Sequence, residues 1–206
     1  MRTNLMQLRR LVRARVGVPV TDDFLPDHIL DDHINLACQT IDSEGRWPWN
    51  EVGEVVTLTG ASPDIIPAED WRSTRAVIHD QRELGLVAPA DLLRVFDLTS
   101  DLPTVWCPMG DVIAVRAKPA GTIEVMHYYY RECMWLYDDN DSPRLPGAYT
   151  GALVAKAAEL LATRESSGGD VSRHAEEYAK WVTRMRRETR RSTTGVHVRV
   201  RPGNWV

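Results

Sequence analysis

The spacing of the apolar residues changes twice along this chain, and this change limits the folds that the chain can adopt. From about Thr3 to Gly17, and again from Asp23 or Pro26 to Ser43, apolar residues recur every three or four positions, as on one face of an α-helix. Between Val52 and Tyr130 this spacing is absent, and short β-prone runs alternate with turn-forming residues. Helical spacing returns at about Pro146. We therefore expect an α+β protein: an antiparallel α-helical bundle of about four helices with an inserted small antiparallel β-sheet.

The β-prone region is expected to be an insertion, because helices precede and follow it. With 206 residues, 43% of them hydrophobic, the chain can bury a core, and its size suits one domain. We expect a single domain over residues 1–193, with the β-rich insertion at about 52–135, and an extended C-terminal tail over residues 194–206. The expected strands are Val52–Thr59, Ser73–His79, Thr104–Cys107, Val112–Arg116 and Thr122–Tyr130, with a short helix at Pro89–Phe96.

The tail over residues 194–206 alternates valine with histidine or arginine, which is the period of a β-strand. No neighbouring segment offers a hairpin partner, and an unpaired strand is only marginally stable in water. We expect the tail to add to the surface of another molecule, with its tryptophan as an aromatic anchor, the alternative being a frayed terminus. The candidate docking residues are Val196, Val198, Arg199, Val200, Arg201 and Trp205.

Charge is unevenly distributed, although the net charge is only -4. From Arg184 to Arg201 there are seven arginines and one glutamate, and Arg184, Arg187 and Arg191 are candidates for a basic interface helix. The basic residues of this helix could contact nucleic acid, dock on an acidic protein surface or simply be solvated. Near the N-terminus, residues 1–21 hold five arginines and no acid, whereas 22–32 hold five aspartates and no base. We expect these two blocks to face different partners.

Sequence motifs of catalysis and cofactor binding are missing. There is no GxxxxGK[ST], GxSxG or HExxH pattern, so we expect no catalytic residue and no cofactor. The best metal candidates are Asp27, His28, Asp31, Asp32 and His33, but acidic residues at a helix start already suit the helix dipole, and we expect no metal. We interpret His127 as a core or edge histidine with satisfied hydrogen bonds, the alternative being a catalytic base. No apolar run is long enough to cross a membrane.

The three cysteines, Cys38, Cys107 and Cys133, are widely separated and have no CxxC spacing. This pattern suggests neither a disulfide framework nor a zinc site, and it favours a reducing compartment.

The triplet Trp47-Pro48-Trp49 lies where the second helix gives way to the first strand. Two indoles around a rigid proline are expected to form a structural aromatic junction that packs the bundle against the sheet. A ligand-stacking role for these rings is the alternative.

Four segments follow one another in a distinctive order. They are the helix with Ile34-Asn35-Leu36-Ala37-Cys38-Gln39-Thr40-Ile41, then Arg46-Trp47-Pro48-Trp49, the strand Ile123–Tyr130, and the helix opening at Leu145-Pro146-Gly147-Ala148-Tyr149. This order resembles the head-to-tail adaptor proteins of tailed bacteriophages. The resemblance covers most of residues 20–165. It implies a structural protein of the virion neck, made in the host cytoplasm, that assembles as an about dodecameric ring on the portal protein. The tail over residues 194–206 would dock onto the portal, which accounts for a tail without an internal partner.

The partners implied by the resemblance are the portal protein, neighbouring copies of the chain, a stopper or tail-completion protein, and double-stranded DNA that passes through the channel without sequence-specific binding. No membrane is implied. Two other functions stay open. One is a DNA-binding packaging or regulatory protein that uses the arginine-rich helix, whose affinity would fall steeply with salt. The other is a small hydrolase, which a cleft holding His127 and paired carboxylates would support.

Overall fold

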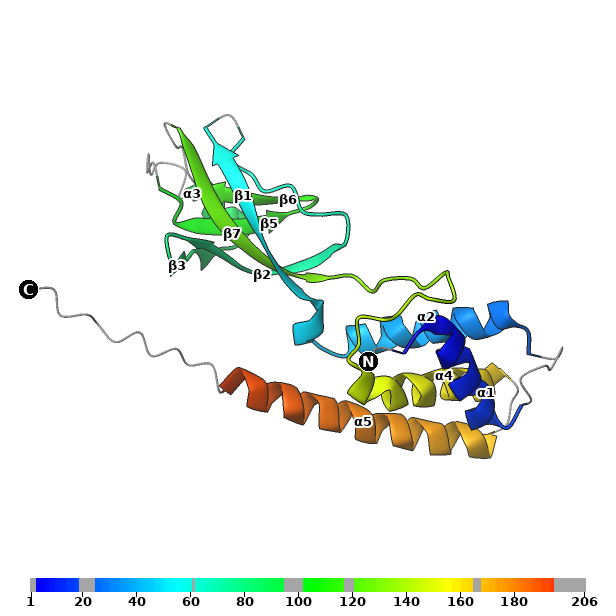
Figure 1. Ribbon diagram of the computed structural model, residues 1–206. Coiled ribbons are helices and arrows are strands. Elements are labelled where there is room, and N and C mark those ends of the chain that lie inside the picture. Colours follow the sequence, from blue (N-terminus) through cyan, green and yellow to red (C-terminus); the bar gives the residue numbers. More distant parts are fainter. Residues whose placement is uncertain are drawn as a thin grey trace, which may run out of the picture. The chain divides into compact units, whose positions relative to one another are not determined.

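The computed structural model describes residues 3–18, 25–60, 62–94, 102–116, 121–164 and 168–194. The chain forms two compact units (Figure 1). The helical unit comprises Met1–Trp49 and Cys133–Val206, and the β-rich unit comprises Asn50–Glu132. The expected α+β class is confirmed.

Among the described residues, four α-helices belong to the helical unit: α1 (Leu5–Val16), α2 (Asp27–Ser43), α4 (Thr150–Arg164) and α5 (Gly168–Thr194). Two 3₁₀ helices, η1 (Pro48–Asn50) and η3 (Gly147–Tyr149), follow the end of α2 and precede α4. The Asn4 side chain accepts a hydrogen bond from the Gln7 backbone N–H while the Gln7 side chain accepts one from the Asn4 backbone, which is a capping box that starts α1. Gly17, at φ 76°, ends α1 in the left-handed conformation that glycine tolerates best.

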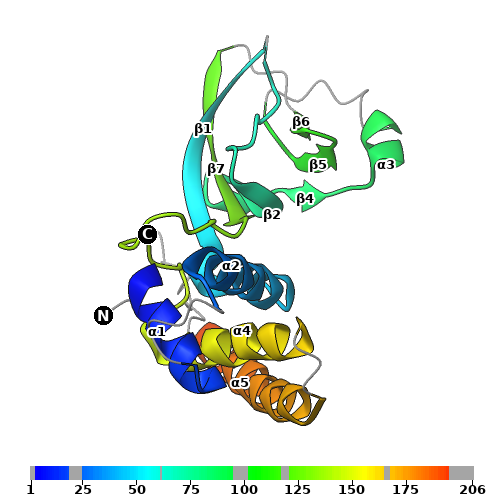
Figure 2. The same ribbon diagram turned by 90° about the vertical axis from the view of Figure 1, so that its right-hand side faces the viewer.

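Figure 2 shows the four helices lying against one another. Their apolar faces form one core. α4 and α5 approach closely because Gly151 has no side chain: a Cβ at this position would lie 2.5 Å from the ring of Trp181. The fully buried large side chains of this core are Leu5, Leu8, Leu30, Ile34, Ile41, Leu136, Leu153 and Met185. None of the helices that the structure describes is both long enough and apolar enough to cross a membrane.

The described part of the β-rich unit forms two sheets. The first has the order β1-β7-β2-β3 and the second the order β4-β5-β6. The strands are β1 (Glu51–Thr59), β2 (Trp71–His79), β3 (Arg82–Glu83), β4 (Gly85–Leu86), β5 (Val105–Met109), β6 (Val112–Arg116) and β7 (Thr122–Arg131). The five expected strands are all present, but the sequence predicts one antiparallel sheet. The structure has two sheets, and β4 pairs with β5 in parallel.

Strand alternation explains how the two sheets enclose a core. Trp106, Ile113 and Val115 of the second sheet face Leu58, Val77 and Val125 of the first, and all six are buried. The intervening residues Cys107 and Ala114 point to the other face, where they contact Leu92 of the short helix α3 (Pro89–Arg94).

Candidate functional site

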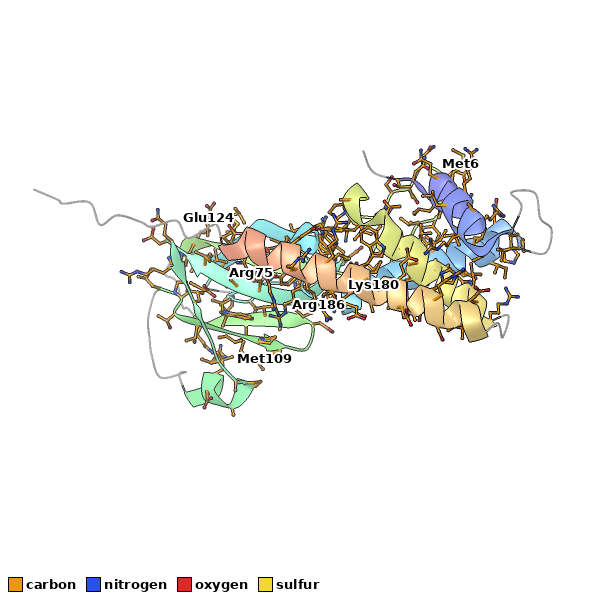
Figure 3. All side chains as sticks on the ribbon, turned by 90° about the horizontal axis from the view of Figure 1, so that it is seen from below. Met6, Arg75, Met109, Glu124, Lys180 and Arg186 are labelled. Carbon is orange, nitrogen blue, oxygen red and sulfur yellow. The ribbon has the colours of Figure 1, made fainter. Side chains whose placement is uncertain are left out.

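Helix α5 presents the candidate basic surface. Its buried side follows the helical period, with His174, Tyr178, Val182 and Met185 in the core. Arg184 and Arg187 are exposed, and Lys180 and Arg186 lie along the same helix in Figure 3. The backbone of Arg191 belongs to α5, while its side chain lies outside the described residues.

Carboxylates of the same unit already pair with part of this basic surface. Arg184 Nε donates to Glu188 Oε1 at 2.8 Å, and the Tyr149 hydroxyl donates to the other oxygen of Glu188 at 2.7 Å. These bonds, Arg184 first, lower the pKa of the Glu188 carboxyl. Arg186 donates to the backbone and side-chain oxygens of Glu44 at 2.9 and 2.7 Å. Arg186 therefore helps to position α5, and Arg184 pairs with Glu188 of the same helix, which leaves Arg187 as the better candidate for an outside partner.

The aromatic junction lies in the helical unit. The Trp47 side chain is buried, its indole N–H donates to the Ile41 carbonyl at 2.7 Å, and its ring stacks on Trp49 with centroids 5.0 Å apart. The ring of Trp49 in turn packs against the ring of Tyr149, with centroids 5.5 Å apart. Burial of Trp47 favours the structural interpretation over ligand stacking. Tyr149 joins this junction to Glu188 and the basic helix, a link that the sequence did not predict because its residues are far apart in the chain.

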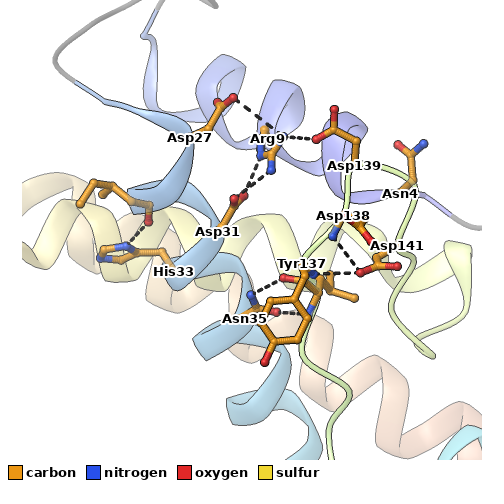
Figure 4. Close-up of polar contacts among 12 residues, drawn as sticks. Asn4, Arg9, Asp27, Asp31, His33, Asn35, Tyr137, Asp138, Asp139 and Asp141 are labelled. Atoms are coloured by element: carbon orange, nitrogen blue, oxygen red, sulfur yellow. Dashed lines mark hydrogen bonds and ion pairs between the residues drawn. The ribbon is translucent and has the colours of Figure 1, made fainter.

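The basic and acidic blocks near the N-terminus bind each other, so the prediction that they face different partners is wrong. Arg9 of α1 donates to both carboxylate oxygens of Asp31, at 2.6 and 2.8 Å, and also contacts Asp139 (Figure 4). Arg13 donates to Asp27 at 2.7 Å and to the Leu25 carbonyl at 2.9 Å. The hydrogen bond to Asp31 is the main cause that raises the pKa of Arg9. Sequence alone missed this because pairing depends on how α1 and α2 pack.

Several candidate metal ligands already have partners within the protein. Asp27 and Asp31 are held by arginines, and His33 Nδ1 lies 2.7 Å from the Ile29 carbonyl oxygen. Over the described part of the chain, no three His, Cys, Asp or Glu side chains gather closely enough to hold a metal ion.

The segment between β7 and α4 is fastened to α1 and α2. The buried Asn35 amide donates to the Leu136 carbonyl at 3.0 Å, and its oxygen accepts from the Leu136 N–H at 2.8 Å (Figure 4). Carbonyls of Asp141 and Asp139 accept the first free N–H groups of α1, from Leu5 and Met6. The segment nevertheless exposes three large apolar side chains: Met134, Trp135 and Tyr137 are 37, 38 and 76% exposed.

An open groove lies among α1, α4 and α5. Its volume is about 470 Å³, and apolar atoms make up most of its surface. Arg15 of α1 and Glu177 of α5, which form an ion pair, lie at this groove. The other lining residues are Leu11, Ala14, Thr150, Gly151, Val154 and Ala155.

His127 is buried in the β-rich unit, and both of its ring nitrogens have partners. Nδ1 lies 3.0 Å from Glu54 Oε1, and Nε2 lies 3.0 Å from Thr74 Oγ1. The Trp71 indole N–H donates to the same Thr74 oxygen at 3.1 Å, which leaves the Thr74 proton for His127. Burial lowers the pKa of His127 despite Glu54. The carboxylate and hydroxyl come from distant strands, so sequence spacing could not reveal them. These contacts satisfy the hydrogen-bonding groups of His127, as predicted for a core histidine.

Two of the three cysteines lie side by side in the helical unit. Cys38 of α2 and Cys133 line one small cavity, and the neighbouring Cys133 raises the pKa of the Cys38 thiol. Cys107 is buried in the β-rich unit. The tail residues Val196, Val198, Arg199, Val200, Arg201 and Trp205 lie outside the described residues.

A family model described as SU10 adaptor protein matches residues 3–201 of the chain. The match spans both units and extends into the tail up to Arg201. A search of curated proteins finds no match to this chain.

Proposed function

The chain belongs to the SU10 adaptor protein family, a family of phage head-to-tail adaptors, and from this premise we propose that it is a structural virion protein that joins the capsid portal to the tail. Copies of the chain form an about dodecameric ring beneath the portal in the neck, after synthesis in the host cytoplasm. Double-stranded DNA passes through the ring without sequence-specific binding, and a stopper or tail-completion protein contacts the ring. The protein has no catalytic activity. The observation that carries this proposal is the family match over residues 3–201.

The tail over residues 194–206 docks onto the portal in this proposal. It follows α5, whose exposed Arg187 favours an acidic protein surface beside the docking site. Each tail contact is weak by itself. A ring presents many copies at once, so the effective local concentration of the remaining tails rises after the first has bound, and the joint becomes stable.

Ring formation requires two different surfaces that fit each other on every copy, because a closed head-to-tail ring is built from heterologous contacts. The groove among α1, α4 and α5 and the exposed aromatic side chains of Trp135 and Tyr137 are such a pair: one is a hollow lined mainly by apolar atoms, and the other is a pair of exposed rings. Burying aromatic surface in an apolar hollow is favourable. We propose that Trp135 and Tyr137 of one copy enter the groove of the next.

Tail docking is tested with portal rings and two forms of the chain, one ending at Thr194 and one extending to Val206. Only the longer form is expected to co-sediment with the portal. A full-length Trp205→Ala variant should weaken the interaction without shortening the chain. Equal binding by the truncated form would show that the tail does not dock.

Ring contacts are tested by sedimentation velocity of Tyr137→Ala and Trp135→Ala variants at concentrations where the wild-type chain assembles, or with portal present. Both variants should lose assembly. Leu86→Ala is the matched control, because Leu86 is also an exposed apolar residue, 64% exposed, and belongs to the β-rich unit. Loss of assembly in the control, or none in the aromatic variants, would contradict the assignment.

The alternative, a DNA-binding packaging or regulatory protein, rests on the exposed charge of α5. It has less support because Arg184 and Arg186 already have carboxylate partners. It predicts that Arg187→Glu weakens binding to duplex DNA and reduces its salt dependence, whereas the adaptor proposal predicts only weak, sequence-independent DNA binding.

A further inference from the structure

Cys38 and Cys133 meet although 94 residues separate them in the chain. Cys38 lies in the last part of α2, and Cys133 is the first residue of the helical unit after the β-rich unit. Both line a cavity of about 20 Å³, together with Met134, Pro143 and Leu145. Cys133 is the main cause of the raised pKa of the Cys38 thiol, as expected of two neighbouring thiols. A disulfide needs an S–S bond length of about 2.05 Å, and the cavity beside the two side chains leaves room for them to approach.

The two thiols differ in access and in reactivity. Cys38 is only 6% exposed, whereas Cys133 is half-buried. Interaction with the Cys133 thiol, followed by burial and the charges of Cys133 and Asp42, raises the pKa of Cys38. Because the thiolate is the nucleophile, Cys38 reacts slowly with reagents from solution. Cys133 is therefore the residue that an external oxidant reaches first.

We propose that Cys38 and Cys133 are an oxidisable dithiol whose disulfide joins α2 to the segment that follows β7. The oxidant is a small disulfide such as oxidised glutathione. The Cys133 thiolate attacks one of its sulfur atoms, which forms a mixed disulfide between Cys133 and glutathione and releases one glutathione thiolate. The Cys38 thiolate then attacks the Cys133 sulfur and releases the second glutathione. The protein loses two protons and two electrons, and oxidised glutathione is reduced to two glutathione thiols.

The bond suits a protein that moves between two redox environments. Disulfides are rare in a reducing cytoplasm and persist on virions outside the cell. A dithiol that is reduced during synthesis and oxidised after release would add a covalent link between α2 and the Trp135–Tyr137 segment only in the finished particle. The inference concerns the isolated chain and does not depend on ring formation or portal docking.

The experiment treats the purified, reduced full-length chain with oxidised glutathione, then unfolds it and blocks remaining thiols with N-ethylmaleimide for mass spectrometry. The untreated chain should take up the reagent at all three cysteines. The oxidised chain should take it up at one, Cys107, and peptide mapping should recover a Cys38–Cys133 crosslink that dithiothreitol removes. Cys107→Ser is the matched control and should form the crosslink at the wild-type rate.

Two further variants keep the proposal falsifiable. Cys38→Ala should stop at the mixed disulfide and retain glutathione on Cys133. Cys133→Ser should leave Cys38 unmodified over the same period, because Cys38 is buried. A lasting glutathione adduct on the wild-type chain, crosslinks only between chains, or three reactive thiols after oxidation would each overturn the proposal.

Discussion

Replacing Asn35 by alanine tests what holds the segment between β7 and α4 in place. Asn35 is 1% exposed and makes two hydrogen bonds to the backbone of Leu136, which is also 1% exposed. The substitution leaves a buried N–H and a buried C=O without partners. Each unpaired group lowers the free energy of unfolding by about 1–3 kcal/mol. Alanine stabilises the helix by roughly 0.6 kcal/mol through its higher helix propensity. We expect the free energy of unfolding of the helical unit to fall by about 2–5 kcal/mol.

The measurement combines urea unfolding with hydrogen exchange at the Leu136 amide, since the two units need not unfold together. Gln39→Ala is the control: it is an exposed position on the same helix and should change stability by less than about 0.5 kcal/mol. A loss below about 1 kcal/mol in Asn35→Ala, with the Leu136 amide still protected, would refute the reasoning.

Asn35→Asp sharpens the test, because it changes the hydrogen-bonding groups and almost nothing else. A carboxylate keeps the acceptor for the Leu136 N–H but faces the Leu136 carbonyl with another acceptor, in a buried site. A protonated carboxyl can donate there again. The folded state therefore holds this proton more tightly than the unfolded state, and the difference in stability between Asn35→Asp and the wild-type chain should shrink as the pH falls from 7 to 4. A difference that does not depend on pH would argue against the donor role of the amide.

Two further predictions follow from packing and from burial. Gly151→Ala should destabilise the helical unit by about 1–3 kcal/mol because its Cβ would meet Trp181, whereas Gly121→Ala, where nothing lies within 4 Å, should have little effect in a thermal melt. Because the folded-state pKa of His127 lies below its unfolded value, the stability that it contributes is present above about pH 6.5 and is lost as the pH falls. Hydrogen exchange of the β2 and β7 amides should therefore quicken between pH 7 and 5, after correction for intrinsic rates, and His127→Gln should flatten that dependence.

The sequence predicts the elements of this fold much better than their pairing. Helices α1, α2 and α5 follow from their apolar period alone, and the expected Val112–Arg116 strand has the bounds of β6. Strands β3 and β4 have two residues each, which is too short for a periodic pattern, so the second sheet and its parallel pair could not be predicted. Pairing depends on contacts between residues far apart in the chain.

The contacts of the candidate site were missed for the same reason. The charges of Arg9, Asp31 and Asp139 were visible in the sequence, but a charge pattern does not say whether its partner lies in the same chain. The cysteines are comparable: an odd number and irregular spacing gave no sign that Cys38 and Cys133 meet. In contrast, the buried state of Trp47 was predictable, because large aromatic residues at the junction of two elements are usually core.

The end of α5 limits where the proposed portal contact can lie. Met185 is the last residue of this helix that the structure describes as buried, and α5 continues to Thr194. Beyond Met185 the helix is held by Arg186 at Glu44 and by Tyr149 at Glu188, so the tail starts from a defined position on the helical unit. Because an extended chain spans at most about 3.3–3.6 Å per residue, Trp205 can reach no further than about 40 Å from Thr194. A map of the assembled neck in which no portal surface lies within that distance would exclude Trp205 as the anchor.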